Sequence, residues 1–209
     1  MSEATPALPR LTRTQEWALA VTIAVVTANA YYIHPIIGEV AKGFGIGAAT
    51  IGLVPALNQL ALALGILLLL PLGDFYSNRR LCLIFVAGQT LSLGGMVLAQ
   101  DFALFTAAST LLGFFTIAPY LIPAFASKRV APERLGQVTA LLTAGVIFGI
   151  LVARMGAGII AEYADWHAVY VAAFALMVGV TAFLPIAMRS EAAAPKRAAA
   201  SYGALIASV

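Results

Sequence analysis

Long stretches without charged residues dominate the pattern of hydrophobic and polar positions along this chain. Five stretches lack Asp, Glu, Lys and Arg altogether, and a sixth is interrupted only by Arg154. A helix needs about 20 apolar residues to cross a hydrocarbon core of about 30 Å, and each stretch is long enough. A soluble helix would return charge to its surface every few residues. The pattern therefore predicts six transmembrane helices, at residues 17–37, 48–71, 81–99, 103–126, 137–160 and 167–188.

Composition supports lipid, rather than water, as the solvent of these segments. Hydrophobic residues make up 62% of the 209 residues and charged residues 10%, whereas a soluble domain usually carries about 25% charged residues. We therefore expect an all-α membrane protein. Cys82 is the only cysteine, so neither a disulfide within the chain nor a cysteine-based metal site is expected. The sequence lacks the G-x-x-x-x-G-K-S/T pattern that binds nucleotide phosphates, and no cofactor is predicted.

The positions of the basic residues predict how the protein is oriented. Lys and Arg are retained on the cytoplasmic side of membrane proteins, and six spans would place ten of the twelve on one side. We expect a multi-pass protein of the cell (inner) membrane with both termini cytoplasmic. The net charge of +3 then reflects topology and does not indicate nucleic acid. The ten residues are Arg10, Arg13, Arg79, Arg80, Lys128, Arg129, Arg134, Arg189, Lys196 and Arg197.

The chain is predicted to form one membrane domain with short polar ends. Residues 1–15 are interpreted as a cytoplasmic tail, 16–188 as the six-helix domain and 189–209 as a cytoplasmic linker. The linker becomes apolar again over its last residues, but this stretch is too short to span a bilayer. It is either an interfacial tail or, as we favour, the lead-in to a further helix. The length of the native gene product beyond Val209 would decide between the two.

The segment between the second and third predicted helices brings an acid and two bases together at a membrane surface. Gly73 and Asp74 end one helix, and Arg79 and Arg80 precede the next. Oppositely charged groups on a short loop can pair in one conformation and separate in another, which suits a gate. The alternative is that the two arginines only anchor the topology.

This segment, LPLGDFYSNRRLCL, resembles the signature loop of major facilitator superfamily transporters, roughly G-x-x-x-D-R-x-G-R-R. Leu70 and Phe75 stand where a glycine and a basic residue are usual. Three other stretches resemble bacterial efflux-permease-like members of the same superfamily. They are NAYYIHP at 29–35, VAPERLGQ at 130–137 and DWHAVY at 165–170.

The resemblance covers most of the chain in the right order, and it is to the amino-terminal six-helix half of such a transporter. It implies the N-terminal half of a major facilitator fold, with six helices arranged as a 3+3 bundle. The partners that it implies are a small-molecule solute, the lipid bilayer and a second six-helix half. That half would come from a missing continuation or from another copy of the chain. The resemblance also implies that Asp74 faces a helix end in the other half.

The fifth predicted helix carries small residues at every fourth position, namely Gly145, Gly149, Ala153, Ala157 and Ala161. Such a stripe lets another helix backbone approach closely, and this kind of packing drives helix association in lipid. We expect the stripe to be a packing surface first. The antiporter version of this helix usually carries a proline in its glycine-rich run. None occurs at 137–161, which weakens the case for drug–proton antiport.

Arg154 is the charged residue that lies deepest in a predicted span. A guanidinium at this depth is costly unless it faces a wet cavity, pairs, or reaches outward along the helix. We consider both a functional contact, for an anionic group or a gate, and outward reach towards Glu162. Uncharged polar residues could line the same path, or they could only bond one helix to another. They are Asn29, Tyr31, Tyr32, Asn58, Gln59 and Gln89.

These features favour a secondary transporter, present here as its N-terminal half, that moves a small solute by alternating access. Efflux coupled to protons is the expected mode. The alternative is a non-transporting membrane scaffold or assembly partner. An enzyme is not expected, because an intramembrane hydrolase needs a base at the depth of its nucleophile. His34 and His167 both fall near the outer surface.

Overall fold

The computed structural model describes residues 10–188, and these residues form α-helices, one short 3-10 helix and brief connections. The predicted linker at 189–209 lies outside the described residues. Six helical segments are long and apolar enough to cross a membrane, which confirms the predicted number. We number them spans 1 to 6. They are Arg13–Gly43, Ala48–Asp74, Asn78–Val97, Phe102–Ser127, Pro132–Tyr163 and Trp166–Ala187.

Capping residues mark the start of four helices of the described chain, and several predicted boundaries shift by a few residues. Thr12 caps α1 (Arg13–Ala28) through a reciprocal pair of hydrogen bonds with Gln15, at 3.0 and 3.3 Å. Such boxes satisfy amide groups that have no partner within the first turn. α8 (Pro132–Tyr163) begins five residues before the predicted start, because a proline is well suited to the first turn of a helix. Ser77, Asp101 and Asp165 cap α5 (Asn78–Val97), α6 (Phe102–Phe115) and α9 (Trp166–Ala187).

Spans 1 and 4 are each broken near their middle, although the hydropathy pattern predicts continuous helices. Span 1 consists of α1 and α2 (Ile33–Gly43), and span 4 consists of α6 and α7 (Ala118–Ser127). In each span a proline follows the break, at Pro35 and at Pro119. A proline lacks an N–H group, and its ring clashes with the carbonyl four residues earlier. The regular helix therefore ends before each proline and starts again beside it.

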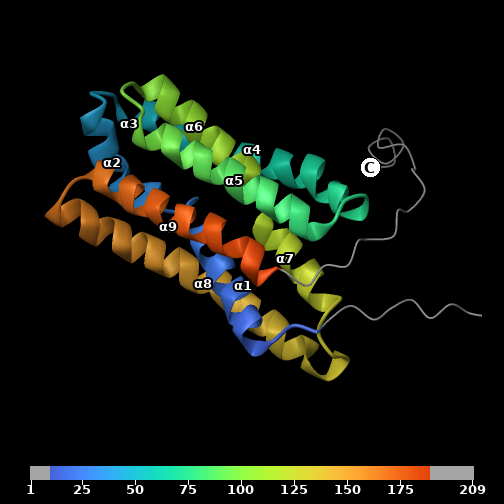
Figure 1. Ribbon diagram of the computed structural model, residues 1–209. Coiled ribbons are helices and arrows are strands. Elements are labelled where there is room, and N and C mark those ends of the chain that lie inside the picture. Colours follow the sequence, from blue (N-terminus) through green and yellow to red (C-terminus); the bar gives the residue numbers. More distant parts are fainter. Residues whose placement is uncertain (1–9, 189–209) are drawn as a thin grey trace, which may run out of the picture.

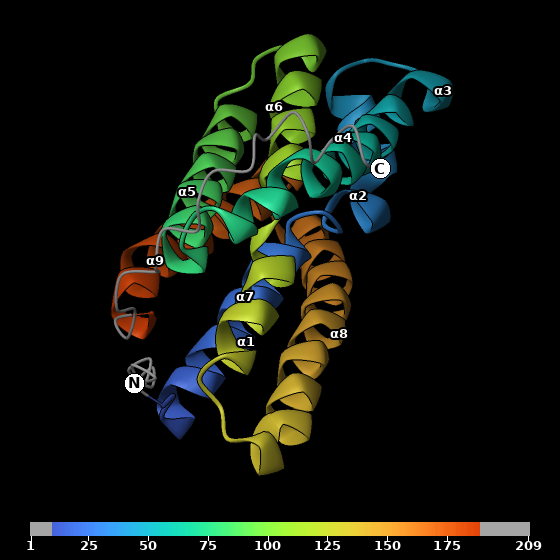
Figure 2. The ribbon, with the colours of Figure 1, turned by 90° about the vertical axis from the view of Figure 1, so that its right-hand side faces the viewer.

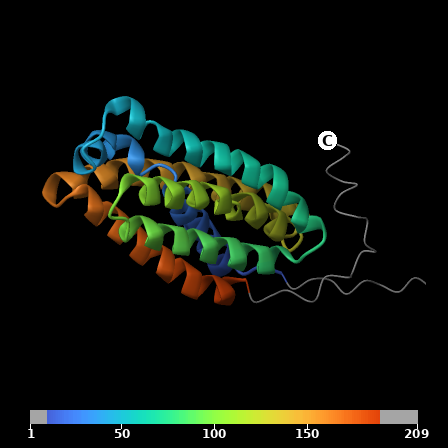
Figure 3. The same ribbon diagram turned by 90° about the horizontal axis from the view of Figure 1, so that it is seen from above.

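The spans form two groups of three, which is the expected 3+3 bundle. α1 packs mainly against α8 and α9, and α6 packs mainly against α4 (Leu53–Leu69) and α5 (Figure 1). The first span of each three-span repeat thus contacts the second and third spans of the other repeat. Two short helices, α3 (Ala48–Ile51) and η1 (Leu70–Asp74), extend α4 at its two ends. Figure 3 shows α4 and α9 along opposite sides of the molecule, with α6 and α5 between them.

Glycines let the helices within these groups cross backbone against backbone. A Cβ atom added to Gly145 would lie 2.6 Å from the carbonyl oxygen of Ala20, and one added to Gly149 would collide with the backbone of Ala24. In the other group, a Cβ atom on Gly113 would collide with the backbone of Asn58. The α1–α8 and α4–α6 crossings are therefore built alike. Ala153, Ala157 and Ala161 are also buried on α8.

The two ends of the described chain lie at the same end of the bundle. The Nε2 atom of Gln15, near the start of α1, donates to the carbonyl oxygen of Ala187, at the end of α9, over 3.2 Å. The N–H of Leu11 donates to the carbonyl oxygen of Arg129, between α7 and α8, over 3.1 Å. Figure 2 shows α7 beside α1 and α8 in this half of the molecule. The two ends of the described chain lie together because an even number of spans returns the chain to the side on which it started.

Candidate functional site

The acid and bases of the predicted gating segment lie on two helices joined by a very short turn. Gly73 and Asp74 end η1, and α5 begins at Asn78, so the irregular chain is shorter than the loop expected at 73–80. Asp74 is exposed, and within residues 10–188 the structure shows no ion pair between its carboxylate and either arginine. Arg79 instead donates from Nη2 to the carbonyl oxygen of Pro185 on α9, over 3.4 Å. Arg80 is exposed.

Arg154 and Tyr31, which the sequence marks separately, come together beside the break in span 1. The guanidinium carbon of Arg154, on α8, lies 5.7 Å from the centre of the Tyr31 ring, within the range of a cation–π contact. Tyr31 also stacks on His34, with 5.6 Å between ring centres. Tyr120 is exposed on α7, just after the break in span 4. The break in span 1 therefore places an aromatic ring between a histidine and the one charged residue deep in a span.

The predicted amide residues separate into buried and exposed positions. Asn58 is buried and donates from Nδ2 to the carbonyl oxygen of Ser109 on α6, over 2.7 Å. Gln59 is exposed, because neighbouring residues on a helix point in different directions. Asn29 is buried in the break of span 1, and neither polar atom of its side chain has a hydrogen-bond partner within the described residues. Tyr32 is half-buried in the same break.

Gln89 makes two specific hydrogen bonds that the sequence alone does not predict. It lies fully buried on α5, and its Nε2 atom donates to the carbonyl oxygen of Val26 over 3.1 Å and to the Oγ1 atom of Thr116 over 2.9 Å. Val26 is one turn before the break in span 1, and Thr116 is in the break of span 4. One side chain thus contacts both interrupted spans.

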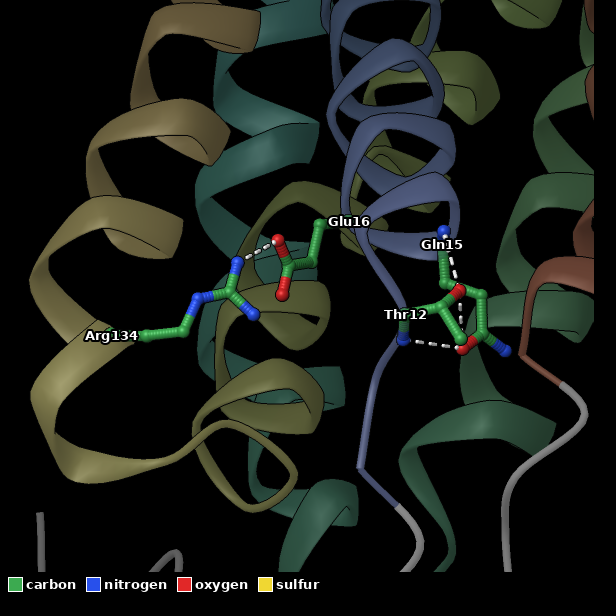
Figure 4. Close-up of polar contacts among 4 residues, drawn as sticks. All are labelled: Thr12, Gln15, Glu16 and Arg134. Atoms are coloured by element: carbon green, nitrogen blue, oxygen red, sulfur yellow. Dashed lines mark hydrogen bonds and ion pairs between the residues drawn. The ribbon is translucent and has the colours of Figure 1, made fainter.

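A buried ion pair joins α1 to α8 at the end of the bundle where α1 begins. The Nη2 atom of Arg134 donates to the Oε2 atom of Glu16 over 2.8 Å, as Figure 4 shows. Glu16 is only 4% exposed, and its Oε1 atom has no hydrogen-bond partner among the described residues. Sequence reasoning missed this pair. The available signals were an acid at the start of the first apolar stretch and the VAPERLGQ segment that contains Arg134.

Two further surface features lie away from the Tyr31–Arg154 cluster. A hollow of about 560 Å³ lies at the end of the bundle where α9 begins, and it is lined in part by Phe44, Trp166 and His167. The Nε2 atom of His167 is 3.2 Å from the carbonyl oxygen of Val97 there. The face of α8 from Pro132 to Ile147 forms an open surface lined by residues of this helix. This face of α8 has no neighbouring helix in the described chain.

Six membrane-spanning helices, two of them broken at matching positions, define a class of multi-pass membrane proteins. Matching breaks in the two repeats, beside a polar cluster, are typical of secondary transporters. Comparison with known families agrees, since residues 19–207 match the Major Facilitator Superfamily. The chain belongs to this superfamily. The resemblance of its sequence to major facilitator superfamily transporters is thereby confirmed. The all-α membrane fold expected for an N-terminal half is confirmed as well.

Curated relatives carry transporter names. The chain is 30% identical over 162 residues to the uncharacterized transporter YgaY of Escherichia coli, in strains K12 and O157:H7. It is 27% identical over 158 residues to SCO4007 of Streptomyces coelicolor, which is named a probable transporter. Each match covers 76% of this chain but 40% or 37% of the relative. The chain thus spans less than half the length of the curated relatives that it matches.

Proposed function

We propose that this chain is the N-terminal half of a secondary active transporter that exports a small solute by alternating access, driven by the proton gradient. The observation that carries the proposal is the pair of breaks in spans 1 and 4, beside which Tyr31 and Arg154 meet. Broken helices at corresponding positions of two repeats mark the substrate site in many transporters. They also provide bends through which such spans can move.

In this proposal Arg154 contacts an anionic group of the solute, and Tyr31 holds the guanidinium in place. Arg154 is exposed, and within residues 10–188 the structure shows no acidic partner for it. A cation at such depth needs an anion or water nearby. Asn29, whose buried side-chain amide has no hydrogen-bond partner among residues 10–188, would join the path when the break in span 1 opens.

The second wall of the path would be a second six-helix half, from a continuation of the chain or from another copy. Two observations support this. Spans 2 and 5 bury only 22% and 17% of their most apolar windows, whereas span 1 buries 61%. The curated relatives are also more than twice as long as the matched segment. The exposed faces of α4 and α8 are therefore proposed as the contact surface for that half.

The proposed orientation follows the basic residues. Arg13, Arg79 and Arg134 lie at the end of the bundle where α1 starts and α9 ends. Most of the described acidic residues lie at the other end. Positive charge is retained in the cytoplasm, so both termini are placed on the cytoplasmic side of the inner membrane. Asp74, Arg79 and Arg80 then form a cytoplasmic gate.

The transport proposal is tested by flux through the complete native gene product in sealed, inside-out membrane vesicles. We expect an imposed proton gradient to drive uptake of organic anions, with benzoate and its neutral analogue benzamide as the first pair of probes. Arg154→Gln should reduce anion flux about tenfold, since bonds to charged groups contribute about 1.5–3 kcal/mol. Arg154→Lys should retain part of the flux. Replacement of the exposed neighbour Met155 by Leu is the control.

Flux that is absent with every solute tested, from a demonstrably complete protein, would reject the transporter and favour a membrane scaffold. Gradient-driven flux that is unaffected in Arg154→Gln would retain the transporter and remove this residue from the path.

The gate assignment predicts that Asp74→Asn impairs transport while membrane insertion stays intact. We expect flux to fall about fivefold or more, because the neutral amide loses the charge that a gating partner would recognise, an effect of about 1 kcal/mol. Flux per inserted molecule is the measurement, with the insertion level read from a fluorescent fusion. Glu133→Gln, an exposed acid at the same end of the bundle, is the matched control. Equal flux in Asp74→Asn and wild type would reject the gate.

A further inference from the structure

Gln89 links the two breaks of the fold through a single amide group. Its side chain is fully buried at the middle of α5. The two hydrogens of Nε2 are both used, one on the carbonyl oxygen of Val26 and one on the Oγ1 atom of Thr116. The first acceptor belongs to span 1 and the second to span 4. Spans 1 and 4 therefore share one donor group on span 3.

The carbonyl of Val26 is available because span 1 is broken. In a regular helix the N–H of Ala30 would donate to Val26, four residues earlier. In the break, Ala30 instead donates to Thr27, over 3.2 Å. A buried carbonyl that loses its helical donor destabilises the fold unless another donor replaces it. Gln89 supplies the replacement, so its bond depends on the shape of the break.

The hydroxyl of Thr116 is oriented to accept from Gln89. Thr116 ends α6 with a ψ angle of 51°, which is outside the helical range. Its Oγ1 atom donates its single hydrogen to the carbonyl oxygen of Leu112, over 2.7 Å. Only its lone pairs remain, and one of them accepts from Gln89. The result is a directed chain of hydrogen bonds from Gln89 through Thr116 to Leu112.

We propose that Gln89 is a positioning residue that couples the two breaks, so that spans 1 and 4 change their bend together. A change of bend in either span moves an acceptor of the same amide and so disturbs the bond to the other. The coupling itself requires no solute, and its use in alternating access rests on the proposed function. Mutations that change only one of the two breaks test the coupling directly.

The experiment is hydrogen–deuterium exchange of the purified protein in lipid nanodiscs, followed over residues 27–33 and 113–118. Gln89→Leu should accelerate exchange about fivefold in both segments, because each break loses one stabilising bond. Thr116→Val removes the acceptor in span 4, together with the local bond to Leu112, and leaves the acceptor in span 1 in place. Coupling predicts faster exchange in span 1 as well, and Thr116→Ser, which keeps the hydroxyl, should restore the wild-type pattern.

Two controls separate coupling from general loosening. Thr110→Val removes a hydroxyl on α6 that makes the same type of bond, to the carbonyl of Thr106, without contacting Gln89. Gln59→Leu removes an exposed amide from the neighbouring span. Both should leave the two segments unchanged. Over residues 27–33 the double variant of Gln89→Leu with Thr116→Val should exchange no faster than Gln89→Leu alone, since for span 1 the two changes break the same link.

An effect of Thr116→Val confined to 113–118 would show that the breaks are independent and would overturn the proposal. So would unchanged exchange in Gln89→Leu. If Gln89→Leu does not fold, the comparison of Thr116→Val with Thr116→Ser decides alone. Coupled exchange in a protein without gradient-driven flux would reject the proposed transport while keeping the coupling.

Discussion

Replacement of Gly149 by valine is expected to destabilise the bundle by about 3 kcal/mol, at the upper end of the usual cost of overpacking. The new Cβ atom would collide with backbone atoms of Ala24, where α8 crosses α1. Backbone cannot rotate away as a flexible side chain can, so the two helices must separate along the crossing. The free energy of unfolding, from titration of mixed micelles with SDS, is the measurement.

Gly156 provides a matched control on the same helix. A Cβ atom added there meets nothing within 4 Å, so Gly156→Val carries the same change in helix propensity without a collision. We expect it to alter the free energy of unfolding by less than about 1 kcal/mol. Equal stability of the two variants would contradict the close α1–α8 crossing. The small-residue stripe would then have no packing role.

Replacement of Glu16 by glutamine is expected to lower the free energy of unfolding by about 1–2 kcal/mol. Breaking a fully buried ion pair costs about 3–5 kcal/mol, but the Arg134 side chain is 36% exposed and water screens part of the loss. The Glu16 side chain ties the first turn of α1 to α8, so the variant should also loosen this turn. SDS titration measures the first effect and hydrogen exchange at 13–19 measures the second.

A double-mutant cycle isolates the Glu16–Arg134 contact. The combined change of Glu16→Gln and Arg134→Gln should cost less than the sum of the two single changes, since each single variant already breaks the pair. Glu133→Gln is the control, because Glu133 is exposed beside Arg134. Additive costs would show that the two side chains do not stabilise each other.

The break positions show where sequence reasoning reached its limit. Pro35 and Pro119 are visible in the sequence as sites of bending, yet hydropathy predicts continuous helices through both. Whether a proline bends or interrupts a span depends on what satisfies the freed backbone groups. In span 1 the break also leaves the carbonyl of Val26 without its helical donor, and Gln89, more than 50 residues away along the chain, donates to it instead. No local pattern contains this information.

Polar residues within the spans show the same limit. Asn58 and Gln59 are adjacent amides with equal claims in the sequence, but α6 covers Asn58 and leaves Gln59 exposed. Arg154 is conspicuous as a lone charge, whereas its contact with Tyr31 requires α8 to lie beside the break in span 1. The partner of Glu16 became evident only when the fold placed Arg134 against it.

The sequence by itself determined the number of spans, their order and the side on which positive charge gathers. These are local properties, because transfer into lipid depends on the composition of each segment of about 20 residues. Only the tertiary structure decided which spans cross, which polar groups are satisfied and where the two broken helices share a donor. These depend on contacts between residues far apart in the chain, and their geometry arises from packing rather than from hydropathy.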